Sequence, residues 1–174
     1  MDTGILLLRL IVGLVMAAHG SQKVFGWFGG AGPDGVGQYL ETLGFRPGRR
    51  HALGAGYVEI VGGLLLALGL FTPLAAALIV SVMIVAAATV HWNNGFFITN
   101  GGWEYNLVIG AAALSIAFTG PGALSLDALA GYATGGIASG VFAAVVGILG
   151  AVGQLALRRL SPSSLSQEQA NVGH

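Results

Sequence analysis

A long apolar stretch near the N-terminus constrains the fold of this chain more than any other feature. Residues 4–25 are apolar from Ile5 through Ala18 except for Arg9, and the glycine-rich segment 26–30 ends the pattern. At a rise of about 1.5 Å per residue, a helix of this length crosses the roughly 30 Å hydrocarbon core of a bilayer. The whole chain is 55% hydrophobic and 8% charged, with a mean hydropathy of +0.80, which is typical of an integral membrane protein.

One side of this predicted helix carries small and charged residues. They recur at spacings of three or four: Arg9, Gly13, Met16, Gly20 and Lys23. His19 lies beside this stripe. A cation inside a membrane-spanning helix usually faces the protein interior or a wet cavity and needs a partner. We therefore expect the stripe to face the other helices.

The composition excludes several kinds of chemistry. The chain has no cysteine, which rules out disulfides, thiol redox couples and thiolate-ligated iron–sulfur clusters, so redox chemistry would need a bound cofactor. The formal net charge is zero and the basic residues are scattered. No basic patch of the nucleic-acid-binding type results, and we expect no nucleic-acid partner.

Four more segments are predicted to form membrane-spanning helices: residues 51–71, 73–90, 103–118 and 137–157. Apolar residues between 36 and 45 predict a short amphipathic helix in the loop after the first span. The expected fold class is an all-α membrane protein, with a four-helix transmembrane bundle plus a fifth transmembrane helix. Residues 1–160 are predicted to form a single transmembrane domain, and residues 161–174 a polar, disordered C-terminal tail.

The predicted topology places the basic residues on one side of the membrane: Lys23, Arg46, Arg49, Arg50, Arg158 and Arg159. The positive-inside rule makes this side cytoplasmic. With five spans, the N-terminus is then outside and the C-terminus is cytoplasmic. The expected location is the inner (plasma) membrane of the cell, as a multi-pass protein in contact with the lipid bilayer.

Alternation of the spans brings ionisable side chains from four helices to the same end of the bundle: His19, Lys23, Glu59, His91 and Glu104. Glu59 lies about eight residues into its predicted helix, roughly 12 Å below the surface. We expect His19, Glu59, His91 and Glu104 to be the catalytic residues. Lys23 and Arg9 are expected to balance the charges of the two glutamates.

Aromatic side chains accompany this cluster, and we expect them to line a cofactor site together with Lys23: Trp92, Phe96, Trp103 and Tyr105. They also fit an interfacial belt, because tryptophan and tyrosine favour that depth of the membrane. The glutamates, in turn, could serve only to neutralise the buried cations.

Three chemistries could use the cluster. A quinone could enter from the bilayer, hydrogen-bond to His19 or His91 and receive protons through a histidine beside a carboxylate. A metal could be bound by the two histidines and two glutamates, but the Glu-x-x-His pairs of di-iron bundles are missing. A substrate or proton path without electron transfer is the third use.

The fifth span contributes none of these ionisable groups. It carries two ridges of small residues: Gly136, Gly140 and Ala144 on one, and Ala143, Gly147 and Ala151 on the other. Such ridges favour close packing against the four-helix core or against a second copy in a homo-oligomer.

The order and spacing of several motifs resemble the DoxX family of small bacterial membrane proteins. The motifs lie between Leu6 and Asp127: His19-Gly20-x-x-Lys23-x-Phe25-Gly26, Glu59-x-x-Gly62-Gly63, Gly69-Leu70-x-Thr72-Pro73, His91-Trp92-x-x-Gly95-Phe96-Phe97, Gly102-x-Glu104-Tyr105 and Gly120-Pro121-Gly122. The fifth helix departs from the family's minimal four-helix pattern.

The resemblance implies a relation to the membrane subunit of thiosulfate:quinone oxidoreductase. A quinone-linked oxidoreductase role in sulfur or oxidative-stress metabolism is therefore the first hypothesis, with quinone as the cofactor and a metal as a weaker alternative. The second is a non-catalytic scaffold that recruits soluble redox enzymes, a sulfurtransferase and a superoxide dismutase, through the loop after the first span and its arginines.

Overall fold

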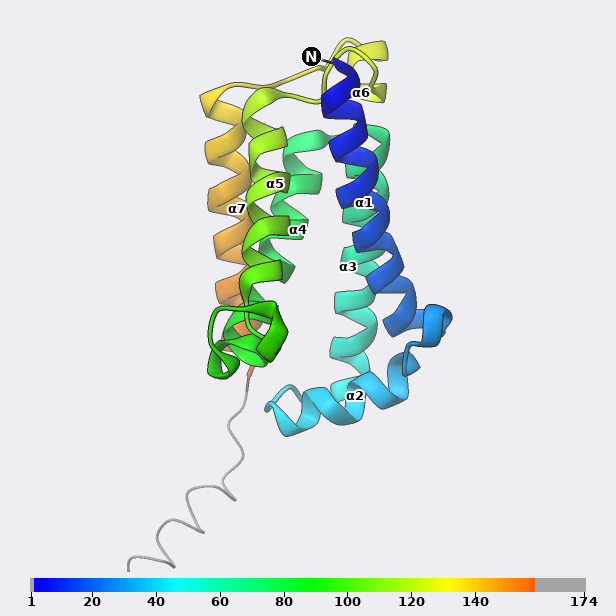
Figure 1. Ribbon diagram of the computed structural model, residues 1–174, viewed down its shortest axis with the longest axis vertical. Coiled ribbons are helices and arrows are strands. Elements are labelled where there is room, and N and C mark those ends of the chain that lie inside the picture. Colours follow the sequence, from blue (N-terminus) through cyan, green and yellow to red (C-terminus); the bar gives the residue numbers. More distant parts are fainter. Residues whose placement is uncertain (1, 159–174) are drawn as a thin grey trace, which may run out of the picture.

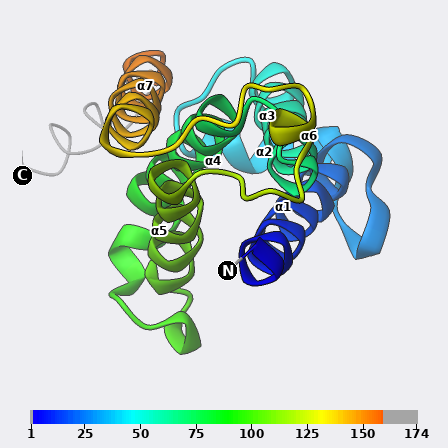
Figure 2. The ribbon, with the colours of Figure 1, turned by 90° about the horizontal axis from the view of Figure 1, so that it is seen from above.

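The computed structural model describes residues 2–158 as a bundle of long helices (Figures 1 and 2). Its main helices are α1 (Asp2–Phe25), α2 (Gly32–Thr42), α3 (Gly48–Leu68), α4 (Thr72–Ala86), α5 (Glu104–Thr119), α6 (Leu126–Leu129) and α7 (Ile137–Ala156). A π-helical turn, η2 (Ala87–His91), continues α4, and the short 3₁₀ turns are η1 (Trp27–Gly29), η3 (Trp92–Asn94) and η4 (Ile98–Asn100). The tail 161–174 lies outside the described residues.

The predicted all-α membrane fold is confirmed. Four helices are long and apolar enough to cross a membrane, namely α1, α3, the continuous segment Thr72–Asn94 and α7, and α5 is a shorter apolar helix. Successive long helices run in opposite directions, so one end of the bundle carries α2 and the other carries α6 (Figure 1). We call these the α2 end and the α6 end.

Glycines bring the backbones of α1 and α3 into direct contact. Gly13 lies against the backbone of Gly63, and Gly20 lies against that of Gly56, so that a Cβ atom at any of these positions would collide with the facing helix. Four of the five residues of the stripe predicted for the first span are buried here, namely Arg9, Gly13, Met16 and Gly20, while Lys23 is partly exposed. Small residues at such crossings are the usual device of membrane helices, which gain van der Waals contact where there is no hydrophobic drive.

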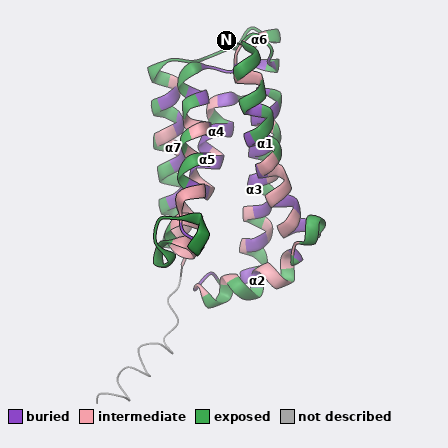
Figure 3. Ribbon diagram, viewed as in Figure 1, coloured by how far each residue is buried: buried purple, intermediate pink, exposed green. Residues whose placement is uncertain are grey.

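The helices α4, α5 and α7 form the other half of the bundle. Both α5 and α7 pack against α4 and against each other, while α3 joins the halves through its contact with α4. The core takes side chains from all five long helices, including Met16, Leu66, Ile79, Ile116 and Ala143, and the buried surfaces face inward (Figure 3). The ridge Ala143, Gly147 and Ala151 of α7 is buried as expected.

At the α6 end, Arg9 is fully buried and donates from Nη2 to the carbonyl of Leu124. Its guanidinium occupies the space that a side chain at position 69 would need, and Gly69 ends α3 with a φ of 64°. The expectation that Arg9 balances Glu59 or Glu104 is therefore wrong. Those glutamates lie toward the α2 end of the bundle. Arg9 lies at the α6 end, where the segment before α6 folds back over the start of α1.

Asp127 fixes the turn between α3 and α4 at the same end. Its buried carboxylate accepts hydrogen bonds from the backbone N–H of Phe71 at 2.8 Å and of Thr72 at 2.9 Å, and from Thr72 Oγ1 at 2.8 Å. The backbone N–H of Asp127 donates to the Gly69 carbonyl at 2.8 Å. Three donors on one carboxylate satisfy the start of α4, where helical N–H groups have no partner of their own.

Replacing Gly63 by alanine should weaken the α1–α3 contact. The new methyl group meets backbone on α1, and overpacking of this kind costs about 1–3 kcal/mol of the free energy of unfolding. The matched control is Gly54→Ala in the same helix, where nothing lies within 4 Å of the new Cβ atom. Unfolding titrations in detergent should show a loss for Gly63→Ala alone, and equal stability of both variants would contradict the packing described.

Asp127→Ala should also destabilise the protein, because it leaves buried backbone donors without an acceptor. The expected loss in the free energy of unfolding is about 1–3 kcal/mol. Asp34→Ala serves as the control, since Asp34 pairs with Arg49 on the exposed surface and should contribute less than about 1 kcal/mol. Thermal unfolding of both purified variants measures the difference, and a loss no larger than that of the control would refute the assigned role.

Candidate functional site

A cavity of about 610 Å³ lies in the half of the bundle nearest the α2 end. Its walls come from α3, α4 and α7, and Val36 and Leu40 of α2 lie across its end. Most of the wall is aliphatic. The polar side chains that reach it are Lys23, Arg50, His51, Glu59, Ser81, Thr89 and Gln154.

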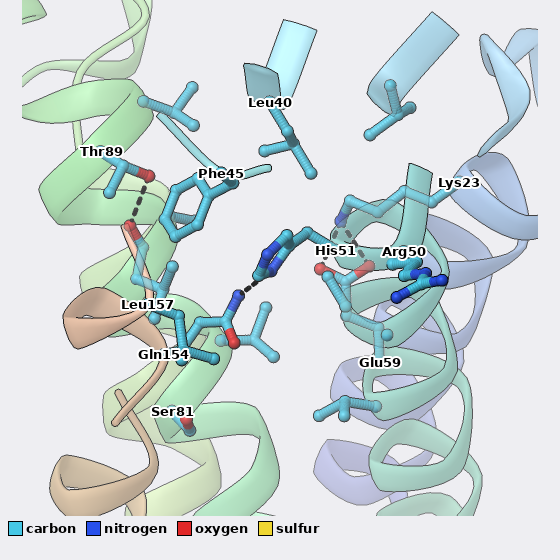
Figure 4. Close-up of a pocket in the computed structure, with 18 of the residues that line it drawn as sticks. Lys23, Leu40, Phe45, Arg50, His51, Glu59, Ser81, Thr89, Gln154 and Leu157 are labelled. Carbon is cyan, nitrogen blue, oxygen red and sulfur yellow. Dashed lines mark hydrogen bonds and ion pairs between the residues drawn. The ribbon is translucent and has the colours of Figure 1, made fainter. Parts of the chain in front are cut away.

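The ion pair of the cavity joins α1 to α3. Lys23 Nζ donates to both carboxylate oxygens of Glu59 (Figure 4). The Glu59 side chain is 3% exposed, whereas that of Lys23 is 28% exposed, so the pair runs from the interior toward the surface. Separating a buried pair of this kind costs about 3–5 kcal/mol, because the remaining charge has no compensation.

A second polar contact crosses the cavity from α3 to α7. The amide Nε2 of Gln154 lies 2.9 Å from Nδ1 of His51, and the two side chains meet in the space between their helices (Figure 4). The ring of Phe45, which is buried, lies beside the His51 ring with 5.4 Å between centroids. The imidazole is therefore held by an amide and an aromatic ring.

The α2 end of the cavity is closed by chain segments. Besides α2, Phe45 and Pro47 contribute to the wall, and Arg158 Nε donates to the carbonyl of Leu43. This bond ties the end of α7 to the segment between α2 and α3. Both α3 and α7 pack on α4, and the cavity lies between them.

The π-helical turn η2 forms part of the back wall. Thr89 and Val90 of this turn line the cavity, and Thr89 Oγ1 donates to the carbonyl of Val85 at 2.8 Å. A π-helical turn widens the helix locally and is often found at functional sites. Here it changes the course of the α4 segment directly beside the cavity.

The structure divides the residues predicted for the site among three places. Lys23 and Glu59 lie in the cavity. His19, one turn before Lys23, instead faces α5, where its Nε2 lies 3.3 Å from the hydroxyl of Tyr105 and the two rings meet edge to face. This contact spans α1 and α5.

The remaining predicted residues gather in the segment between α4 and α5. His91 Nδ1 donates to the carbonyl of Gly101 at 2.7 Å, and Glu104 Oε2 accepts from the backbone N–H of Ile98 at 2.9 Å. Trp92 stacks on Trp103 with 5.8 Å between ring centroids, and Phe96 meets Trp103 edge to face at 4.8 Å. Within the described residues, none of residues 91–104 lines the cavity.

Sequence reasoning did not select His51 or Gln154. His51 stands at the start of its span, where a polar residue is unremarkable, but it forms a stripe with Ala55 and Glu59 at four-residue spacing. Gln154 is an amide near the end of an otherwise apolar helix. A polar side chain in such a helix usually faces the protein interior, and this signal could have identified it. The fifth span, expected only to pack, therefore contributes to the cavity.

The donors of the cavity do not form a metal site. Within residues 2–158, no three histidine, aspartate or glutamate side chains come close enough to bind one ion. A flat apolar ring with polar substituents suits the cavity better, because the wall is mostly aliphatic and carries a few polar side chains.

Comparisons with known proteins agree with this architecture. Residues 53–136 match the family described as "TQO small subunit DoxD". "Putative oxidoreductase CatD" of Bacillus subtilis (strain 168) is 29% identical over 126 residues, which cover 72% of this chain and 86% of CatD. No solved structure matches the chain.

Two relatives come from Escherichia coli (strain K12). "Inner membrane protein YqjF" is 30% identical over 128 residues, which cover 74% of this chain and 92% of YqjF. "Inner membrane protein YphA" is 34% identical over 130 residues, which cover 71% of this chain and 87% of YphA. Residues 4–92 match the family described as DoxX. With its apolar helices and this match, the chain belongs to the DoxX family of membrane proteins.

Proposed function

We propose that this protein is the membrane subunit of a quinone-linked oxidoreductase and that the cavity between α3, α4 and α7 binds the quinone ring. The observation that carries the proposal is an aliphatic cavity with a buried ion pair, Lys23–Glu59, in its wall. The match to a TQO small subunit and the name of CatD support an oxidoreductase role.

The cavity fits such a ligand in size and character. Pockets for small molecules usually measure about 300–1,000 Å³, are mainly apolar and carry a few polar groups that fix the ligand. The volume of about 610 Å³ and the aliphatic wall meet this description. Because α2 and Phe45 close one end, the ring enters from the hydrocarbon, between α3 and α7.

A bound quinone supplies an acceptor for two electrons and two protons. Glu59 and Lys23 are placed to hold and pass protons, because Glu59 faces the cavity while Lys23 is partly exposed. His19 extends this route in the proposal, since it lies one turn from Lys23 and contacts the hydroxyl of Tyr105. His91 and Glu104 act by holding the segment between α4 and α5.

The electrons come from a soluble partner that oxidises a reduced sulfur compound such as thiosulfate. Two thiosulfate ions release two electrons when their terminal sulfur atoms join, which balances the reduction of one quinone. The α2 end faces the cytoplasm in this proposal, because Lys23, Arg46, Arg49 and Arg50 lie there. These cations would receive the soluble partner on the same side as the ion pair.

Glu59→Gln should reduce quinone-dependent turnover at least tenfold, because an amide cannot exchange a proton with the ring while it keeps nearly the same shape. Membranes that contain the protein and its soluble partner, supplied with thiosulfate and a short-chain ubiquinone, provide the assay. The control is Asp34→Asn, which removes an exposed carboxylate outside the cavity. Unchanged turnover in Glu59→Gln, with normal insertion and folding, would defeat the proposal.

A scaffold that only recruits soluble redox enzymes is the second candidate. It is favoured by the exposed Arg46 and Arg49 at the α2 end, which offer positive charge to an acidic partner. For a scaffold, Arg46→Ala with Arg49→Ala should abolish co-purification of the partner, and lipid extracts of the purified protein should contain no quinone. If quinone is found in lipid extracts of both the wild-type protein and this double variant, the result would favour the oxidoreductase.

A further inference from the structure

The contact between His51 and Gln154 defines the hydrogen-bonding state of the imidazole. The nitrogen of a side-chain amide only donates, so the 2.9 Å contact makes Nδ1 of His51 the acceptor. A neutral imidazole carries its single proton on the other nitrogen in that case. His51 Nε2 is then an N–H donor, and within residues 2–158 it has no hydrogen-bond partner of its own.

The ion pair and Thr89 of the cavity are already engaged in hydrogen bonds. The ammonium group of Lys23 donates to both carboxylate oxygens of Glu59, so these two side chains already form an ion pair with each other. Thr89 donates its hydroxyl proton to the carbonyl of Val85. His51 thus offers a neutral donor that costs no ion pair and no helix hydrogen bond to use.

Its position suits a ligand that lies between α3 and α7. His51 is two turns before Glu59 on α3, about 12 Å away along the helix axis, with aliphatic wall between them. Phe45 flanks the imidazole ring and limits its rotation. Along the axis of α3, the neutral donor His51 and the ion pair of Glu59 thus lie at different depths of the cavity.

We infer that His51 donates from Nε2 to a carbonyl oxygen of the quinone and that Gln154 is the positioning residue that fixes the required tautomer. This inference rests on the proposed function and names the polar end of that site. It also makes α7 a necessary part of the site, because Gln154 is the only polar side chain that the described part of α7 places in the cavity wall.

Gln154→Met tests the role of the amide, since methionine has a similar shape but cannot donate. The probes are menadione, which carries two carbonyl groups, and 2-methylnaphthalene, which carries none. Equilibrium dialysis with the full-length protein in nanodiscs should show about tenfold weaker binding of menadione to Gln154→Met. Binding of 2-methylnaphthalene should be unchanged. His51→Phe should weaken menadione binding at least as much.

The tautomer provides a readout that a merely structural role would not move. In the wild-type protein with ¹⁵N-labelled histidine, the NMR resonances of His51 should report a proton on Nε2, and Gln154→Met should show a mixture of tautomers. Val152→Met is the matched control on the same helix, because Val152 is 57% exposed and does not line the cavity. It should leave both the tautomer and the binding of menadione unchanged.

The outcomes separate this inference from the proposed function. If the wild-type protein does not bind menadione, the proposed function fails and the inference fails with it. If the wild-type binds but Gln154→Met binds menadione equally well, the inference alone is overturned. A proton on Nδ1 in the wild-type protein would also overturn it. Should Gln154→Met not fold, His51→Phe and the wild-type tautomer still decide the question.

Discussion

The ion pair between Lys23 and Glu59 sets the conditions for the rest of the bundle. A carboxylate that is 3% exposed in a membrane helix needs a cation beside it, and Lys23 can serve only if α1 and α3 hold a fixed register. The crossings of Gly13 with Gly63 and of Gly20 with Gly56 supply that register, because the two backbones touch. Charge pairing and close packing therefore depend on each other in this half of the protein.

The cavity follows from how the two halves are joined. Both α3 and α7 pack on α4, and the space between them remains open while the bonds His51–Gln154 and Arg158–Leu43 connect them near the α2 end. The neutral polar contact of the cavity, His51–Gln154, thus also ties the halves together. In the proposed function, ligand binding and the connection between the halves share the same residues.

Hydropathy and helical spacing predicted much of this structure. The apolar segments, the buried stripe of α1 and the small-residue ridge of α7 all follow from periodicity, which is local. The partner of Arg9 could not be predicted, because it depends on a loop more than a hundred residues away folding back over α1. His51 and Gln154 look ordinary in sequence and acquire a role only when α7 is placed opposite α3. His19 and Glu59 share an end of the bundle, but one faces α5 and the other the cavity. They lie on different helices, and local spacing does not fix how α1 and α3 are rotated relative to each other.

Helix α2 lies across one end of the bundle (Figure 1), and its residues Val36 and Leu40 line the cavity there. If the ring arrives through the hydrocarbon, occupancy is set by the mole fraction of quinone in the lipid and not by the amount added to the buffer. Dilution with extra lipid at constant total quinone then lowers the apparent affinity, although the protein is unchanged. Partition coefficients of the quinones, and not only their fit to the cavity, determine how they rank in any assay.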